Sequence, residues 1–232
     1  MGAVLLHPAA AAPSEVMVVA TMHGLHAKSA TYSYDMLYGL VRSAKPDFVG
    51  VEIRAEDLPR EADYLKRNYP AEMIAVAGEW GARAFGFDWL GEDVAGAPVP
   101  ADWWKVRSPL KALERALDGE TTFKSEAMEK ARDDEMKVLA NATAASLNDG
   151  RYDEINDRYY AAFRDMVRGT KYQGLTDFYA ERDRRIDDNI IAFIRAHPGA
   201  RIVILTGADH RGPLLRSLKA TFGDTIRLLP VP

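Results

Sequence analysis

The stretch from Arg201 to Leu215 reads RIVILTGADHRGPLL, and its two halves follow different patterns. The first half, RIVILTG, is nearly continuous in apolar and β-branched residues, which is typical of a strand covered on both faces. A glycine-containing turn follows, and we expect a helix that holds Pro213 in its first turn, where proline is favoured. A buried strand that passes directly into a helix is the repeating unit of an α/β protein.

Runs of the same kind occur elsewhere in the chain. They are VMVVAT (16–21), FVGVEI (48–53), RAFGFD (83–88) and TIRLLPV (225–231). Helical patterns lie between them, for example before Pro46, where Leu37, Leu40, Val41 and Ala44 share one face. Strand–helix alternation implies right-handed crossovers. The sequence therefore predicts an α/β fold with a mostly parallel central sheet flanked by helices, in a single domain over residues 15–232.

Two segments depart from this alternation. Between Arg107 and Arg168 the chain is polar and helix-forming, so we expect a helical insertion at about 105–170 that covers the sheet or forms a lid over one end. Residues 1–14 are small and apolar but lack a basic start, and Pro8 and Pro13 interrupt them. We interpret them as a loose leader without an intact signal peptide, and expect a cytoplasmic protein.

Composition narrows the classes of function. The 232 residues carry a net charge of -4, so no overall basic field attracts nucleic acid or an anionic membrane. No stretch approaches the roughly 18–20 apolar residues that a membrane span needs. Cysteine is absent, which excludes disulfides and thiolate ligands. The expected partner is a small-molecule or peptide substrate, and the sequence carries no prediction of the oligomeric state.

The first four buried runs in chain order each end at or near a residue whose side chain could take part in catalysis or bind a ligand. These residues are His23, Glu52, Asp88 and His210. Each alone has an ordinary structural explanation, such as a turn cap or a side chain facing solvent. However, ligands of open parallel sheets bind outside the carboxyl ends of the strands, where residues far apart in sequence meet. Four coincident endings therefore favour a functional site at this edge.

Arg182 lies on the apolar stripe of a predicted helix, four residues from both Phe178 and Ile186. One explanation is that its side chain extends along the stripe to solvent. The other is a buried guanidinium paired with Glu52 or Asp88, because buried charges are tolerated only when paired. The neighbouring Glu181 would then reach the same cleft from its rim.

Two histidines and a carboxylate without sulfur suit a divalent metal ion such as Zn²⁺, Mn²⁺, Co²⁺ or Fe²⁺. We expect His23, Glu52 and His210 to be the ligands of such an ion. Glu181 or Asp88 would be the base or a further ligand, and Arg182 and Arg54 would position carboxylates or substrate. A metal with open positions activates water, so the natural chemistry is hydrolysis of an ester or amide.

At these residues the chain resembles the TraB/GumN/Tiki superfamily, which is related to erythromycin esterases and ChaN-like haem-binding proteins. The resemblance rests on ATMH (20–23), VGVEIR (49–54), YAERDRRIDDNI (179–190) and GADH (207–210) followed by RG. Ala20 stands where the first Gly-x-x-His motif of the superfamily has glycine. The match covers the two ends of the chain and leaves the helical middle unmatched. It implies an erythromycin-esterase-like or ChaN-like fold and a metal-dependent hydrolase.

Two other interpretations stay open. A ChaN-like carrier of haem or another tetrapyrrole would keep the fold without catalysis. Tyrosine is plentiful, with ten residues, and RYYAAF (158–163) offers candidate axial ligands, although such tyrosines usually serve packing. The third interpretation is a degenerate site that serves only interaction.

Overall fold

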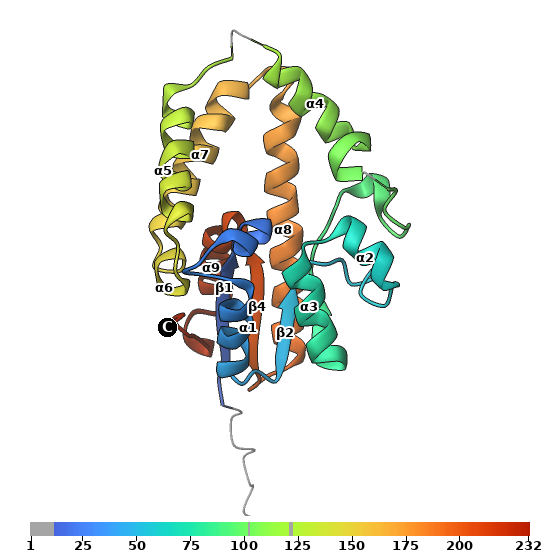
Figure 1. Ribbon diagram of the computed structural model, residues 1–232, viewed down its shortest axis with the longest axis vertical. Coiled ribbons are helices and arrows are strands. Elements are labelled where there is room, and N and C mark those ends of the chain that lie inside the picture. The colour runs from blue at the N-terminus through green and yellow to red at the C-terminus, as the bar shows by residue number, and fades with distance from the viewer. Residues whose placement is uncertain (1–11, 102, 121–122) are drawn as a thin grey trace, which may run out of the picture.

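The computed structural model describes residues 12–101, 103–120 and 123–232. Five parallel strands form a sheet in the order β3-β2-β4-β1-β5 (Figure 1). The strands are β1 (Ser14–Thr21), β2 (Phe48–Val51), β3 (Ala84–Gly86), β4 (Arg201–Gly207) and β5 (Ile226–Leu228). The central pair, β1 and β4, comes from opposite parts of the chain, with Thr21 aligned with Gly207. The predicted α/β fold with a parallel central sheet is confirmed.

The two faces of the sheet have separate cores, because successive strand residues point to opposite sides. Val19 and Val203 face the side covered by α1 (Tyr34–Ser43) and α3 (Ala71–Trp80). Val18 and Ile204 face the side covered by α8 (Gln173–Ala196) and α9 (Ala208–Phe222). The short helix α2 (Ala62–Asn68) precedes α3. Strands buried on both faces explain why the runs in the sequence are apolar without alternation.

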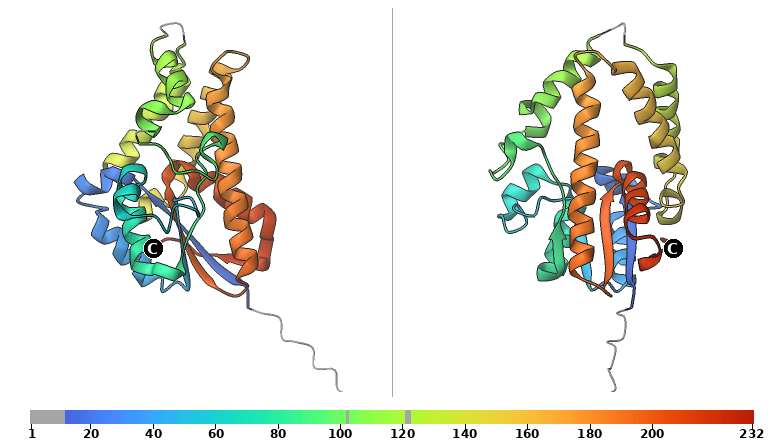
Figure 2. Two further views of the ribbon diagram at one scale, coloured as in Figure 1. Left: turned by 90° about the vertical axis from the view of Figure 1, so that its right-hand side faces the viewer. Right: turned by 180° about the vertical axis from the view of Figure 1, so that it is seen from behind.

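Between β3 and α8 the described chain is helical. It forms α4 (Pro109–Asp118), α5 (Glu126–Ala140), α6 (Ala144–Leu147) and α7 (Arg151–Val167). Together with the first half of α8 these helices make a helical arm that rises beyond the carboxyl ends of the strands (Figures 1 and 2). The arm has its own small core of Leu110, Phe163, Val167, Tyr172 and Leu175.

Short turns complete the chain. The 3₁₀ helices are His23–Lys28, Gly81–Arg83, Glu92–Val94 and Gly223–Thr225, and a π-helical turn spans Trp103–Arg107. Within the described ranges, every helix is too short or too polar to serve as a membrane span. Most of the predicted leader, residues 1–11, lies outside the described residues, whereas Ser14 already belongs to β1.

The predicted start of the last helix was wrong. Helix α9 begins directly after β4, at Ala208, so Pro213 lies inside the helix and not in its first turn. A proline there leaves the carbonyl four residues earlier, at Asp209, without its helical donor. The side-chain amide of Asn156 on α7 donates to that carbonyl oxygen at 2.8 Å, which replaces the missing bond.

Candidate functional site

The carboxyl ends of the strands bring the predicted residues together. Glu52 directly follows β2, His23 follows β1, and His210 lies in the first turn of α9. All three line one cavity of about 280 Å³, together with Arg182 from the middle of α8. Glu52 and His210 are buried, whereas the His23 side chain is 42% exposed and opens the cavity to solvent.

Glu52 lies at the centre of the site with both carboxylate oxygens engaged. Its Oε2 accepts hydrogen bonds from the backbone N–H of Gly207 at 2.7 Å and from Thr206 Oγ1 at 3.0 Å. Its Oε1 accepts from Arg182 Nη2 at 2.7 Å. Burial raises the pKa of this carboxyl, but the positive charges of His210, Arg182 and His23 outweigh burial and lower the pKa to about 2. Glu52 is therefore a fixed negative charge.

Arg182 forms the buried ion pairs that its place on the apolar stripe predicts. Besides Glu52, its Nε donates to Asp88 Oδ1 at 3.0 Å, and its Nη1 donates to His210 Nε2 at 3.1 Å. One guanidinium thus connects the ends of β2 and β3 with α9. Asp88 is reached through Arg182 and does not itself line the cavity. Burial raises its pKa, and the charge of Arg182 only partly opposes this effect.

His210 is oriented from its other side by an acid. Its Nδ1 donates to Asp183 Oδ1 at 2.5 Å, and Asp183 lies on α8 next to Arg182. This bond turns Nε2 toward Arg182, and Nε2 accepts from Arg182 when the ring is neutral. Burial lowers the pKa of His210, but the charges of Glu52 and Asp183 prevail, so the pKa lies above its ordinary value.

His23 also has a carboxylate behind its ring. Its Nδ1 donates to Glu72 Oε1 at 2.8 Å, and Glu72 is a fully buried residue of α3. Thr21 Oγ1 donates to the same oxygen at 3.2 Å. Burial lowers the pKa of His23, but the Glu72 hydrogen bond and the negative charges of Glu52 and Glu72 raise it above 6.5. The arrangement leaves Nε2 of His23 on the other side of the ring, next to Gly207, which also lines the cavity.

Gly207 allows the His23 ring to reach this position. A Cβ atom on residue 207 would lie 2.7 Å from His23 Nε2 and 3.4 Å from Glu52 Oε2. The backbone of Gly207 is extended, with φ at -55° and ψ at 145°, so its angles do not demand glycine. The glycine of GADH is therefore required by the space that the His23 imidazole occupies.

Two predicted site residues lie elsewhere. Arg54 points away from the cavity, because its guanidinium donates to Asp57 Oδ2 at 2.7 Å and to the carbonyls of Val94 and Ala97. It holds the chain after β3 against the end of β2, which is a structural role. The placement of Glu181 at the rim of the cleft was wrong. Its carboxylate accepts from Arg184 and Arg185 on the outer face of α8, and these bonds lower its pKa to about 2.

The three predicted metal ligands share their cavity with a positively charged side chain of the protein, Arg182. Within the described ranges, no three His, Asp or Glu side chains are grouped so that they could hold a metal ion. The guanidinium of Arg182 contacts both Glu52 Oε1 and His210 Nε2, two of the atoms that would bind the ion. Glu52 and His210 therefore suit the guanidinium of Arg182 better than a metal ion.

The two carboxylates behind the histidines, Glu72 and Asp183, are not among the residues predicted from the sequence. Glu72 lies next to the buried Met73 and one turn before the buried Val76, so a charge on an apolar stripe was again the signal. Asp183 had no such signal, because it lies in the charged run ERDRRIDD. Three tyrosines of the helical arm also line the cavity: Tyr152, which no motif marked, Tyr160 of RYYAAF and Tyr179 of YAERDRRIDDNI. No protein-family model matches the chain, and neither does any curated protein or solved structure.

Proposed function

We propose that this protein is a hydrolase of ester or amide bonds in which His23 activates the attacking water. One observation carries this proposal. The half-exposed imidazole of His23 has its Nδ1 fixed by the buried Glu72 and its Nε2 free at a cavity that contains a fixed anion and a fixed cation. A histidine oriented by a carboxylate is the usual general base of hydrolytic enzymes.

Among the acids and bases of the site, His23 is the best base. A general base works best when its pKa lies near the working pH. The pKa of Glu52 is lowered to about 2, and so is that of Glu181, which makes both carboxylates weak bases. Although burial lowers the pKa of His23, the hydrogen bond to Glu72 and the charges of Glu52 and Glu72 raise it above its ordinary value, which strengthens this imidazole as a proton acceptor.

The remaining groups suit the charge that develops during hydrolysis. As water adds to the carbonyl carbon, its proton passes to His23 Nε2 and negative charge gathers on the carbonyl oxygen. Arg182 lines the cavity, and its guanidinium has five N–H donors, of which three make the bonds described above. Nη2 also lies 2.9 Å from Asp88 Oδ1, so the second N–H of Nη1 is the donor left for the oxyanion. When the carbon–oxygen or carbon–nitrogen bond breaks, His23 returns its proton to the leaving group.

This proposal keeps the reaction class that the resemblance implies and changes the role of the metal. Membership of the TraB/GumN/Tiki superfamily or its erythromycin-esterase relatives is part of the proposal. It is supported by the meeting of the two histidine motifs across adjacent strands, and by the glycine of one motif making room for the histidine of the other. Arg182 occupies the position that a metal ion bound by both Glu52 and His210 would need. We therefore expect hydrolysis without added metal.

The test is a screen of activated esters, lactones and short peptides with the purified protein. We expect turnover that persists after chelation and falls on the order of 10²–10⁴-fold in His23→Ala. Glu181→Gln is the matched control and should keep full activity, because that carboxylate faces away from the cavity. Activity that disappears with chelator and returns with Mn²⁺, Co²⁺ or Zn²⁺ would restore the metal-dependent mechanism. Absence of turnover together with a haem absorption band would favour the ChaN-like carrier.

A further inference from the structure

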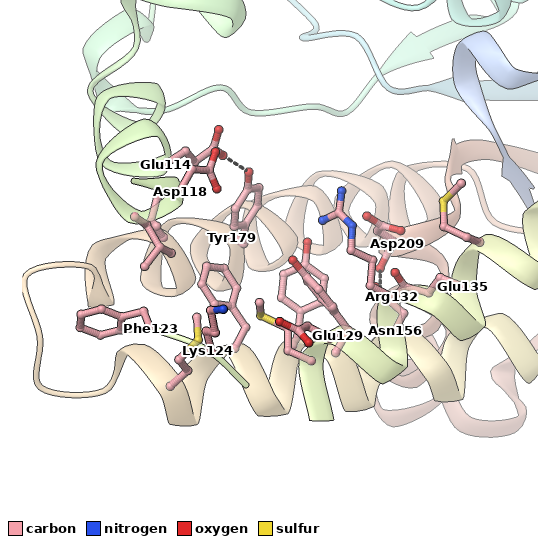
Figure 3. A pocket seen from close by; sticks show the side chains of 18 of the residues that line it. Glu114, Asp118, Phe123, Lys124, Glu129, Arg132, Glu135, Asn156, Tyr179 and Asp209 are labelled. Atoms are coloured by element: carbon pink, nitrogen blue, oxygen red, sulfur yellow. Dashed lines mark hydrogen bonds between the residues drawn. The ribbon is translucent and has the colours of Figure 1, made fainter. Parts of the chain in front are cut away.

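A second and larger cavity adjoins the candidate active site. It measures about 700 Å³ and runs between the helices of the arm, lined by α4, α5, α7 and α8 (Figure 3). Four residues line both cavities: Leu139, Tyr160, Tyr179 and Asp209. Because both cavities share these walls, we treat the larger one as the substrate channel that leads to His23.

The walls of this channel are acidic and aromatic. Six acidic and three basic side chains line it, with tyrosine and phenylalanine rings between them. At the end nearest the active site, Asp209 Oδ1 accepts a hydrogen bond from Tyr152 at 2.6 Å. Glu135 lies close to Asp209 in the same end of the channel (Figure 3). Carboxylates combined with aromatic rings are the surroundings in which proteins bind ammonium groups.

Glu135 brings a buried carboxylate oxygen into this end of the channel. Its Oε1 is buried, and no hydrogen-bond donor reaches it within the described part of the chain. A buried acceptor that the protein leaves unpaired is costly, so such an atom is often completed by a ligand. Burial and the nearby charge of Asp209 raise the pKa of Glu135 to about 7, although Arg132 partly opposes them. A bound cation would supply the missing donor and return the carboxyl to its ionised form.

The position of Glu135 relative to the reaction follows from helix geometry. Leu139, which lines both cavities, lies four residues further along α5. Four residues are about one helical turn, or roughly 6 Å along the axis, on the same face. A group held by Glu135 is therefore a short chain away from the carbonyl that His23 would attack.

We propose that the channel binds a protonated amine through Glu135 and Asp209, so that the substrates are amine-bearing esters or amides with an apolar linker. The class of bond rests on the proposed hydrolase function, whereas recognition of the amine does not. Tyr160 and Tyr179 would cover the linker between the ammonium group and the scissile carbonyl.

The test is calorimetric binding of 4-phenylbutylamine compared with 4-phenylbutanol, which has a similar shape and no charge. We expect the full-length protein at pH 8 to bind the amine at least about tenfold more tightly, as a charge-assisted hydrogen bond gives. Glu135→Gln should abolish this preference. Glu129→Gln is the matched control, because Glu129 lines the same channel on the same helix but is exposed, and it should keep the preference.

Three results would separate this inference from the proposed function. Equal affinity for the two probes in the parent protein, or an undiminished preference in Glu135→Gln, would overturn amine recognition. Near pH 7, amine binding should also release protons, seen as a binding enthalpy that depends on the buffer, because the cation lowers the pKa of Glu135. His23→Ala should keep the preference while losing hydrolysis, so a failure of catalysis leaves the binding result intact.

Discussion

At the scale of single residues, the turn after β1 holds His23 in an uncommon conformation. Its φ is 48°, in the left-handed region that costs a residue other than glycine roughly 1–3 kcal/mol. Neighbouring side chains stabilise this turn. The ring of His26 accepts from the N–H of Met22 at 2.9 Å, and Tyr34 donates to the carbonyl of His23. The two histidines thus have different tasks: His26 builds the turn, and His23 faces the cavity.

The pH dependence of activity should identify His23 as the base. Activity should rise with pH as the imidazole loses its proton, through a pKa above 6.5, because only the neutral ring accepts a proton. Glu72→Gln replaces the negative acceptor that raises this pKa by a neutral amide, so the acidic limb should move to lower pH while the maximal rate falls. The measurement is kcat/KM against pH in both proteins. An unmoved acidic limb would assign the titration to another group.

Substitution of Gly207 tests the contact between the two histidine motifs. Gly207→Ala adds a Cβ 2.7 Å from His23 Nε2, so the ring must move and activity should fall by about tenfold or more. The backbone angles suit alanine, and the melting temperature should change little. Gly78→Ala in α3 is the control, because nothing lies within 4 Å of its added Cβ. Equal activity in both variants would mean that the ring has room.

At the scale of elements, the charge network of Arg182 ties two strand ends to α8 and α9. Arg182→Met leaves Glu52 and Asp88 buried without their cation, and should cost about 3–5 kcal/mol in the free energy of unfolding. Arg184→Met on the same helix removes only exposed ion pairs and should cost less than about 1 kcal/mol. Denaturation in urea measures both. Equal midpoints for the two variants would contradict the role of the buried network.

The same network makes the stability of the parent protein and that of the Arg182→Met variant respond differently to acid. In the parent protein the lowered pKa of Glu52 contributes stability above about pH 4.5, and this contribution is lost as the pH falls toward 2. Without Arg182, the burial that already raises the pKa of Asp88 loses its largest opposing charge, so mild acidification should relieve the variant. We therefore expect the free energy of unfolding of Arg182→Met to rise between pH 7 and 5.

The bond from Asn156 to α9 can be tested with a double-mutant cycle. Asn156→Leu leaves the Asp209 carbonyl without a donor and should destabilise the protein by about 1–3 kcal/mol. In a Pro213→Ala background the restored N–H of residue 213 supplies that donor, so the same change should cost less. A coupling free energy near zero, measured by thermal and urea unfolding, would show that Asn156 acts in another way.

At the scale of the whole molecule, the sheet and the helical arm should open separately. The arm has a core of five buried residues, whereas Val203 and Ile204 of β4 belong to the larger cores that cover the two faces of the sheet. Hydrogen exchange should therefore be slower by about tenfold or more in β1 and β4 than in α4 and the first half of α5. Uniform exchange through both parts would indicate a single cooperative unit.

The sequence predicted the parts of the molecule that follow from short-range pattern. The apolar runs gave the strands, and Arg182 on an apolar stripe gave the ion pairs with Glu52 and Asp88. The parts of the site that were not predicted depend on contacts between residues far apart in the sequence. The metal prediction listed His23, Glu52 and His210 as ligands but did not foresee that Arg182 would bind two of them. Glu181 points outward because two neighbouring arginines on its own helix bind it.

The pairing of β1 with β4 also has a consequence for how the chain is made. Glu15 and Arg201, which meet at the start of this pair, are 186 positions apart. At about 5–20 residues per second, a ribosome needs roughly ten seconds or more to reach β4 after releasing β1. During that time the apolar first strand has neither of its neighbours in the sheet. We therefore expect the newborn protein to depend on a chaperone, or on transient cover by α1 and α3, more than a protein that pairs its strands in order of synthesis.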